Sequence, residues 1–242
     1  MNKIDVINRY NLPNDVHYCT KCVISNQRPR IVFDEDGVCY ACRFSDYKHN
    51  IVDWDEREKM LKELLGKHRR KDGSHDVIVP SSGGKDSGVI AHKLKYEYGM
   101  NPLTVTWAPH LYTNIGWENY KALVDSGFDN IMGHTNGQVY RKLTRLSTIQ
   151  LGDPFQPFIY GQVLFPLQIA LNYNIKLIFS GENGEAEYSG NPLAWDNSGF
   201  SVDNYNEWWF SDFPIEYWLD QGISHQDLGM LVLPKSEIIK EA

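Results

Sequence analysis

The sequence lacks several features that define common classes of protein. No run of 18 apolar residues occurs in the 242-residue chain, so the sequence predicts no membrane-spanning helix. Residues Met1 to Asp5 contain no apolar signal region, and we therefore expect a cytoplasmic protein. Basic residues are not in excess either. The net charge of −7 argues against the broad basic face that nucleic-acid binding usually requires, so we expect no nucleic-acid partner.

Cysteine is absent after residue 42, and the four cysteines present form two pairs. Cys19-x-x-Cys22 and Cys39-x-x-Cys42 are separated by 16 residues, a spacing typical of four-thiolate zinc sites. Apolar runs on either side of the turn at 34–37 predict a hairpin between the pairs. We expect a structural zinc module over residues 1–50, folded largely by its metal. An iron–sulfur cluster is the alternative that the same thiolates allow.

Both common phosphate-loop motifs are missing, but another one is present. The chain contains neither Gly-x-x-x-x-Gly-Lys-Ser/Thr nor Gly-x-Gly-x-x-Gly. It does contain Ser-Ser-Gly-Gly-Lys-Asp-Ser at 81–87, between a β-branched run at 76–80 and a helical pattern at 88–98. A strand, a Gly-Gly turn and a helix N-terminus form an anion site. We therefore expect this loop to bind nucleotide phosphates through a set of residues comprising Ser82, Gly83, Gly84, Lys85, Asp86 and Ser87.

The remainder of the chain alternates strands with helices. Further strands are expected at 102–107, 129–133 and 175–179, with helices at 54–68, 119–126, 137–150 and 158–173. This order predicts an α/β fold with a parallel twisted sheet and helices on both faces. Ligands bind at the carboxyl ends of such strands, so we expect an adenine near Thr106 and Trp107, although Trp107 fits a core position equally well.

An acidic stretch follows the last expected strand, at 180–190. Carboxylates at this edge of a sheet can hold Mg²⁺ against pyrophosphate oxygens. The alternative is a solvated acidic loop. Farther on, the large aromatic residues of 205–218 are expected to pack in the core or at an interface between subunits of a homo-oligomer, and stacking on a sugar ligand is the alternative.

Three motifs together resemble a known family. The loop at 82–87 is similar to the signature of the PP-loop ATP pyrophosphatases, and Ser180, Gly181 and Glu182 match the asparagine synthetases of that superfamily, with Glu185 where they have a magnesium-binding aspartate. The N-terminal cysteines add a third element. The whole chain resembles the bacterial N-acetyl sugar amidotransferases of surface-polysaccharide (O-antigen) and flagellar-glycan biosynthesis. The resemblance implies a PP-loop domain over 51–242 with a Rossmann-like sheet, which family members usually extend beyond this length.

The resemblance also implies a reaction. An N-acetyl sugar, carried by a nucleotide or a lipid, would be adenylated by ATP, and ammonia would replace AMP to give an acetamidino sugar. Lys85 and the loop would stabilise the departing pyrophosphate with Mg²⁺ held by Glu185 and Asp86. Gly181 would belong to the nucleotide site, and Glu182 would orient the amide or handle protons. Ammonia would come from a separate glutaminase subunit, because all four cysteines are assigned to metal.

Two other functions remain open at the level of sequence. A tRNA-thiolating PP-loop enzyme can also carry a zinc module, but the acidic charge and the absence of cysteine after Cys42 count against it. A non-catalytic nucleotide-binding adaptor is the second alternative. Lys85, Asp86, Glu182 and Glu185 favour an enzyme over an adaptor.

Overall fold

A three-stranded parallel sheet forms the centre of the larger part of the molecule. In the computed structural model, which describes residues 4–189, 191–197, 199 and 202–232, the strand order is β1 (Val77–Pro80), β2 (Pro102–Trp107) and β3 (Asn130–Gly133). Val77 lies opposite Pro102, and Trp107 lies opposite Gly133. These three predicted strands and their parallel pairing are confirmed.

The expected fourth strand is reduced to one contact. Ile178 forms a single parallel bridge with Ile78, supported by the Ile78 N–H donating to Leu177 and the Phe179 N–H donating to Ile78. The segment 175–179 therefore runs beside β1 and hydrogen-bonds on one side only, without becoming a regular strand.

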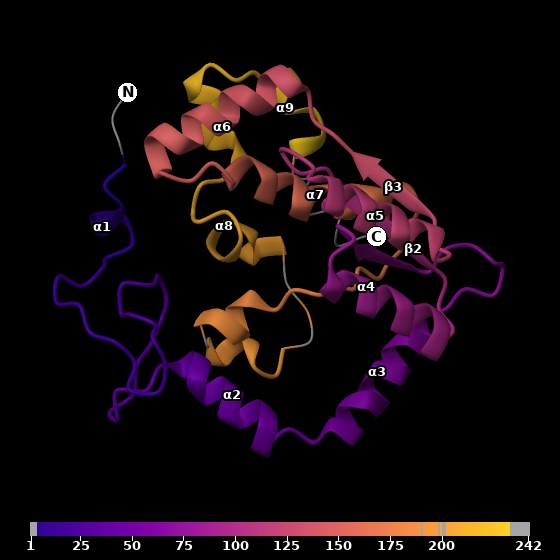
Figure 1. Cartoon of the computed structure of the whole chain (residues 1–242), viewed down its shortest axis with the longest axis horizontal. Coiled ribbons are helices and arrows are strands. Elements are labelled where there is room, and N and C mark those ends of the chain that lie inside the picture. The colour runs from indigo at the N-terminus through magenta and orange to yellow at the C-terminus, as the bar shows by residue number, and fades with distance from the viewer. Residues whose placement is uncertain (1–3, 190, 198, 200–201, 233–242) are drawn as a thin grey trace. The chain divides into compact units, whose positions relative to one another are not determined.

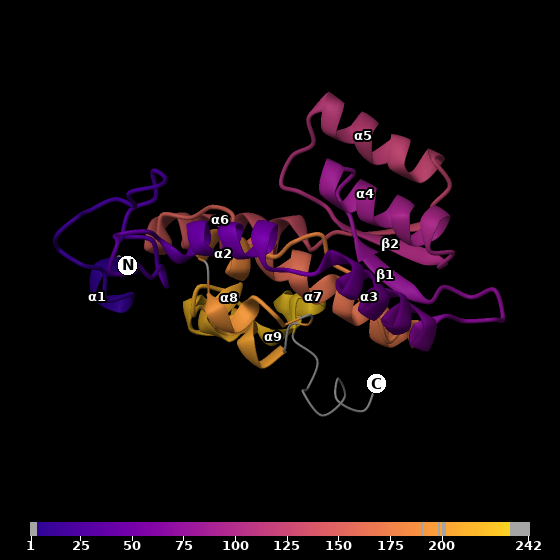
Figure 2. The ribbon, with the colours of Figure 1, turned by 90° about the horizontal axis from the view of Figure 1, so that it is seen from below.

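Each face of the sheet is covered by a different hydrophobic cluster, because successive strand residues point to opposite faces. Val77 and Val79 pack with Leu65, Ala91 and Leu123, which lie on three different helices. These are α3 (Trp54–His68), α4 (Lys85–His92) and α5 (Asn114–Asp125). Figure 2 shows α4 and α5 on the same side of the strands.

The opposite face is covered by long helices and by the aromatic segment. Ile78 packs with α6 (Gly137–Leu151) and α7 (Gln156–Asn172). Phe210, Phe213 and Trp218 are buried, and Trp218 donates to the Tyr160 hydroxyl at 3.0 Å. The expectation that residues 205–218 pack inside the protein is confirmed for these rings.

Helix boundaries follow local capping chemistry. The Asp53 carboxylate accepts from the Glu56 N–H at 3.0 Å and starts α3 where the sequence predicts it. The Asn136 side chain accepts from Gln138 at 2.9 Å at the start of α6, and Gly152 ends that helix in the left-handed conformation, with φ of 74°. A turn of π-helix, Lys93–Glu97, continues α4.

The chain divides into two compact units. The described residues of Met60–Gly181 and Val202–Ala242 form the unit built on the sheet, and those of Met1–Lys59 and Glu182–Ser201 form the other. Segment 182–201 thus packs with the N-terminal residues, a grouping that chain order alone does not give. In the described part of the chain, no helix combines the length and the apolarity needed to cross a bilayer.

Short helices make up most of the smaller unit. They are α1 (Val6–Arg9), α2 (Tyr40–Asn50), a π-turn at Glu185–Ser189 and a 3₁₀ turn at Pro192–Ala194. Figure 1 shows the segment around 185–195 running alongside α2. The remaining short helices belong to the sheet unit: 3₁₀ turns at Val202–Asn204, Ile215–Gln221 and Gly229–Leu231, with α8 (Tyr205–Trp208) and α9 (His225–Leu228).

Candidate functional site

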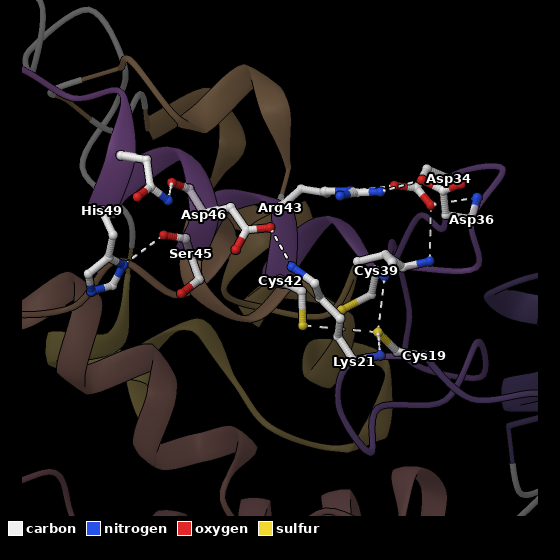
Figure 3. Close-up of polar contacts among 12 residues, drawn as sticks. Cys19, Lys21, Asp34, Asp36, Cys39, Cys42, Arg43, Ser45, Asp46 and His49 are labelled. Carbon is white, nitrogen blue, oxygen red and sulfur yellow. Dashed lines mark hydrogen bonds and ion pairs between the residues drawn. The ribbon is translucent and has the colours of Figure 1, made fainter.

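The four cysteines come together into one cluster. Their sulfur atoms all lie within 4.8 Å of one another, and the Sγ atoms of Cys22 and Cys39 are 3.7 Å apart. Figure 3 shows three of the four, Cys19, Cys39 and Cys42, with the Sγ atoms of Cys19 and Cys42 4.0 Å apart. Four sulfurs bound tetrahedrally to zinc at about 2.3 Å lie about 3.8 Å from each other. The observed spacing therefore fits a single four-coordinate metal ion such as zinc.

Backbone donors prepare this cluster for thiolates. The N–H groups of Lys21 and Cys39 donate to the Cys19 sulfur at 3.3 and 3.2 Å. Burial acts to raise the pKa of Cys19, but these backbone hydrogen bonds outweigh it and lower that pKa to about 6. Burial, together with hydrogen bonds from the neighbouring thiols, raises the pKa of Cys42. One thiolate is thus favoured without metal, and a bound cation would stabilise the other three.

The turn between the cysteine pairs is held by a network of charges. Asp34 Oδ1 accepts from the N–H groups of Asp36 and Val38, both at 3.0 Å. Arg43, on α2, donates to Asp34 at 2.5 Å and to Asp36 at 2.8 Å (Figure 3). The predicted hairpin is present as one antiparallel bridge, Phe33 to Cys39, flanked by backbone hydrogen bonds from Asp34 to Val38 and from Tyr40 to Val32. It does not extend into a regular two-stranded ladder.

The phosphate-loop residues lie together at the carboxyl end of β1. Gly84 occupies the N-cap of α4 and has no side chain to cap the helix, while the Ser87 hydroxyl donates to the Gly84 carbonyl at 3.3 Å. Lys85 and Asp86 begin the helix, and the Lys85 ammonium contacts the Asp86 carboxylate at 2.7 Å with 86% and 59% of the two side chains exposed. The Ser87 hydroxyl accepts from Ser81 at 3.1 Å, and Ser82 Oγ accepts from the Gly84 N–H at 3.3 Å.

Gly83 is required by both conformation and space. Its φ is 83°, in the left-handed region, and a Cβ there would lie 2.6 Å from Tyr120 Cα and N. The loop therefore packs directly on the backbone of α5. The Tyr120 hydroxyl donates to Asn130 at 2.8 Å, and Asn130 donates to Thr106 at 2.9 Å. These bonds form a wall, made of Tyr120, Asn130 and Thr106, that links α5 to the end of β2.

The other nucleotide-site residues predicted from sequence have different surroundings. Gly181 lies against the start of α4, because a Cβ on it would be 3.6 Å from Asp86 Cβ. Thr106 is buried at 1% exposure. Trp107 is also buried, and it packs against Phe165 with ring centroids 5.5 Å apart, as a core residue does.

Two buried donors at this edge are left unsatisfied. Trp107 Nε1 and Tyr140 Oη are inaccessible to solvent, and neither has a hydrogen-bond partner in the part of the chain that the structure describes. Burial raises the pKa of Tyr140 to about 12, so its hydroxyl stays protonated at neutral pH. Buried donors without partners are costly, and an acceptor atom of a ligand or a water would relieve that cost.

Glu182 and Glu185 belong to the smaller unit and differ in exposure. Glu182 is exposed. Glu185 is buried at 8% exposure, and its two carboxylate oxygens accept from Arg30 at 2.5 and 3.3 Å. Ser189 donates to the same carboxylate at 3.2 Å. A Mg²⁺ ion at Glu185 would have to replace the Arg30 guanidinium.

A groove in the smaller unit was not anticipated from sequence. It has a volume of about 600 Å³ beside α2, and its lining includes three aromatic rings. Trp195 stacks on Tyr47 at a centroid distance of 5.3 Å and lies tilted to Tyr40 at 6.3 Å. Arg43 and Asp46 also line the groove. The only signal in the sequence is the aromatic pair at 40 and 47 on one helical pattern, and Trp195 lies too far along the chain to be linked to it.

Comparison with known proteins does not identify the function of the chain. No protein-family model matches the chain, and no curated protein matches it either.

Proposed function

We propose that the protein is an ATP-dependent, AMP-forming amidotransferase that converts the acetamido group of an N-acetyl sugar into an acetamidino group. The observation that carries this proposal is the loop at 82–87, which follows a buried parallel strand, holds Gly83 in the left-handed conformation and opens α4 with Lys85. Such a loop presents backbone N–H groups and a helix dipole to phosphate oxygens. The proposed architecture is a PP-loop domain joined to a zinc ribbon.

The chemistry begins with activation of the amide. The amide oxygen would attack the α-phosphorus of ATP, forming an O–P bond as the bond to pyrophosphate breaks. Ammonia would then add to the imidate carbon, AMP would leave, and one proton would be lost to give the amidine. Lys85 and the first turn of α4 would stabilise charge on the departing pyrophosphate, where fixed donors contribute most.

The base of ATP would lie at the carboxyl end of β2. The placement rests on topology, because ligands of parallel sheets bind at the carboxyl ends of the strands. Trp107 Nε1 and Tyr140 Oη are buried beneath this edge and do not contribute to the placement. The Thr106 side chain is buried, so it would not contact the base directly. It would support the site by accepting the hydrogen bond from Asn130.

Metal roles follow from the carboxylates and thiolates. Asp86 is the exposed carboxylate next to Lys85 and is available to a phosphate-bound Mg²⁺. Glu185 would bind Mg²⁺ only by releasing Arg30. Glu182, which is exposed, would orient the amide or take protons from ammonia. The four-cysteine cluster would hold zinc as a structural ion, because four thiolates leave no open coordination position.

Ammonia would be supplied by a separate glutaminase subunit. Glutamine hydrolysis needs a nucleophilic cysteine, and the chain has no cysteine outside the metal cluster. We place the reaction in the cytoplasm, at the stage where surface polysaccharide or flagellar glycan precursors are made.

The test is release of pyrophosphate and AMP from ATP, with an ammonium salt and a panel of nucleotide-linked N-acetyl sugars. Lys85→Ala should reduce the rate at least about 100-fold while the circular dichroism spectrum stays unchanged. Lys93→Ala is the matched control, because Lys93 forms an exposed ion pair with Glu97 in the helical turn that follows α4. Glutamine should replace ammonium only when a glutaminase is added. Absence of pyrophosphate with every acetamido sugar, but retained ATP binding, would instead favour an adaptor.

A further inference from the structure

Two arginines from the segment between the cysteine pairs, Arg28 and Arg30, reach the acidic segment. Arg30 donates through Nε and a terminal nitrogen to the two oxygens of Glu185, at 3.3 and 2.5 Å, although the residues are 155 positions apart. Arg28 lies over the ring of Tyr188, 5.9 Å from its centroid. A two-point contact between a guanidinium and a carboxylate fixes orientation as well as distance.

The backbone at Arg30 has an uncommon conformation and is fixed by bonds close by. Its φ is 63°, in the left-handed region that residues with side chains rarely adopt. Immediately after it, Phe33 bridges to Cys39, and the Tyr40 N–H donates to Val32 at 2.9 Å. The position of Arg30 is therefore tied by main-chain bonds to the second cysteine pair.

Glu185 in turn organises the segment that follows it. Its main-chain oxygen accepts from the Ser189 hydroxyl and from the Asn191 N–H, the latter at 3.0 Å. Its carboxylate is buried, and a buried charge persists only when it is paired. Arg30 supplies that pairing, so among the described residues loss of Arg30 would leave only the Ser189 hydroxyl bonded to this carboxylate.

The metal cluster reaches the same segment by a second route. Cys39 is the N-cap of α2, and Cys42 lies in its first turn. Farther along α2, Phe44 packs against Ala186 and Ala194, and Tyr47 stacks on Trp195. Both the start of α2 and the turn at Arg30 are held by the residues that would bind metal.

We infer that Arg30 is a positioning residue that couples occupancy of the four-cysteine centre to the conformation of the segment from Glu185 to Trp195. Metal binding fixes the turn and α2, and these fix the segment through the Arg30–Glu185 pair and the Phe44 cluster. Coupling is reciprocal, so if metal binding stabilises the segment, the ordered segment stabilises the bound metal to the same extent. Breaking the ion pair should therefore weaken metal binding by the share of the coupling that this pair carries. The inference depends on the cysteine cluster and not on the proposed reaction.

The experiment compares metal affinity and backbone hydrogen exchange in the full-length chain, without ATP or sugar. Zinc affinity is measured by competition with a chromophoric chelator, and exchange is followed in peptides that contain Glu185 or Trp195. Removal of zinc should speed exchange in these peptides. Arg30→Gln should retain one zinc per chain but weaken its binding at least about fivefold, the lower end of typical coupling, and speed exchange around Glu185. Arg30→Lys should give an intermediate effect.

Two further variants complete the test. Glu185→Gln should weaken zinc binding as Arg30→Gln does, and the double variant should be no worse than Arg30→Gln, because both changes remove one interaction. Arg57→Gln is the control, since Arg57 also pairs with the segment, at Asp196, but that carboxylate is 65% exposed. Its zinc affinity should match the wild type. Unchanged zinc affinity in both Arg30→Gln and Glu185→Gln would overturn the inference, and it would leave the ATP-dependent proposal untouched.

Discussion

Replacing Gly83 with alanine tests the phosphate loop most directly. A side chain in the left-handed conformation costs roughly 1–2 kcal/mol. The new Cβ would also lie 2.6 Å from two backbone atoms of Tyr120, and overpacking of this kind typically costs about 1–3 kcal/mol. The two terms together predict a loss of about 2–5 kcal/mol in the free energy of unfolding, a change of about 30-fold or more in the unfolding equilibrium.

Two neighbouring glycines provide matched controls. Gly84 has a φ of −73°, and the nearest atom to an added Cβ is the movable Ser82 hydroxyl at 3.2 Å, so Gly84→Ala should cost only the N-cap preference for glycine over alanine, about 0.5–1 kcal/mol. Gly88 lies inside α4 with open space around it, and Gly88→Ala should stabilise the protein by about 0.5–1 kcal/mol.

The assay is urea unfolding followed by circular dichroism, together with binding of a fluorescent ATP analogue. Gly83→Ala should lose stability and nucleotide binding together, because the loop can accept the side chain only by moving away from α5. If Gly83→Ala unfolds within 0.5 kcal/mol of Gly84→Ala (about the spread expected of neutral surface changes), then the described loop conformation is wrong.

Three more predictions address the metal centre, the acid stability and the acidic segment. Metal analysis should give one zinc per chain, and Cys39→Ser should lower both zinc content and melting temperature; iron with visible absorbance would contradict this. The hydrogen bond from Arg43 holds the pKa of Asp34 below its usual 3.8, so this pair stabilises the folded state fully above about pH 4 and the contribution is lost as pH falls through the lowered pKa. Asp34→Asn should therefore flatten the stability curve on the acid side, and an unaltered curve would refute the assignment. Glu185→Gln should raise the Mg²⁺ concentration needed for half-maximal rate, whereas Glu182→Gln should lower the maximal rate alone; wild-type kinetics in both would remove the segment from the reaction.

Local chemistry made much of the fold predictable from sequence. Asp53 marks the start of α3 because its carboxylate caps the helix, and the sheet strands are short apolar runs bounded by turns. The phosphate loop is readable because a strand, two glycines and a helix start occur together at 76–88. The cysteine spacing similarly predicts the cluster that the structure shows.

Contacts between distant residues account for what the sequence did not reveal. The Arg30–Glu185 pair spans 155 positions, and no local pattern links an arginine in a turn to a carboxylate in a later loop. The run at 175–179 has the composition of a strand but meets β1 through one bridge. How far such a segment pairs depends on its neighbours in the folded chain, which composition does not reveal. Asn130, which joins the phosphate-loop wall to β2, is a polar residue at a strand start and carries no motif.

The smaller unit is built from two segments far apart in the chain, so its N-terminal segment is synthesised well before the segment it packs against. The ribosome adds about 5–20 residues per second, so Glu185 emerges about 8–30 s after Arg30, from which it is 155 positions away. Throughout this interval the N-terminal turn and α2 exist without their packing partners. A nascent chain that acquires its metal early would keep Arg30 and Phe44 in place for the later segment, whereas a chain starved of metal would expose the Phe44 surface to neighbouring nascent chains. Availability of metal during translation would then decide how much of the protein reaches its native form.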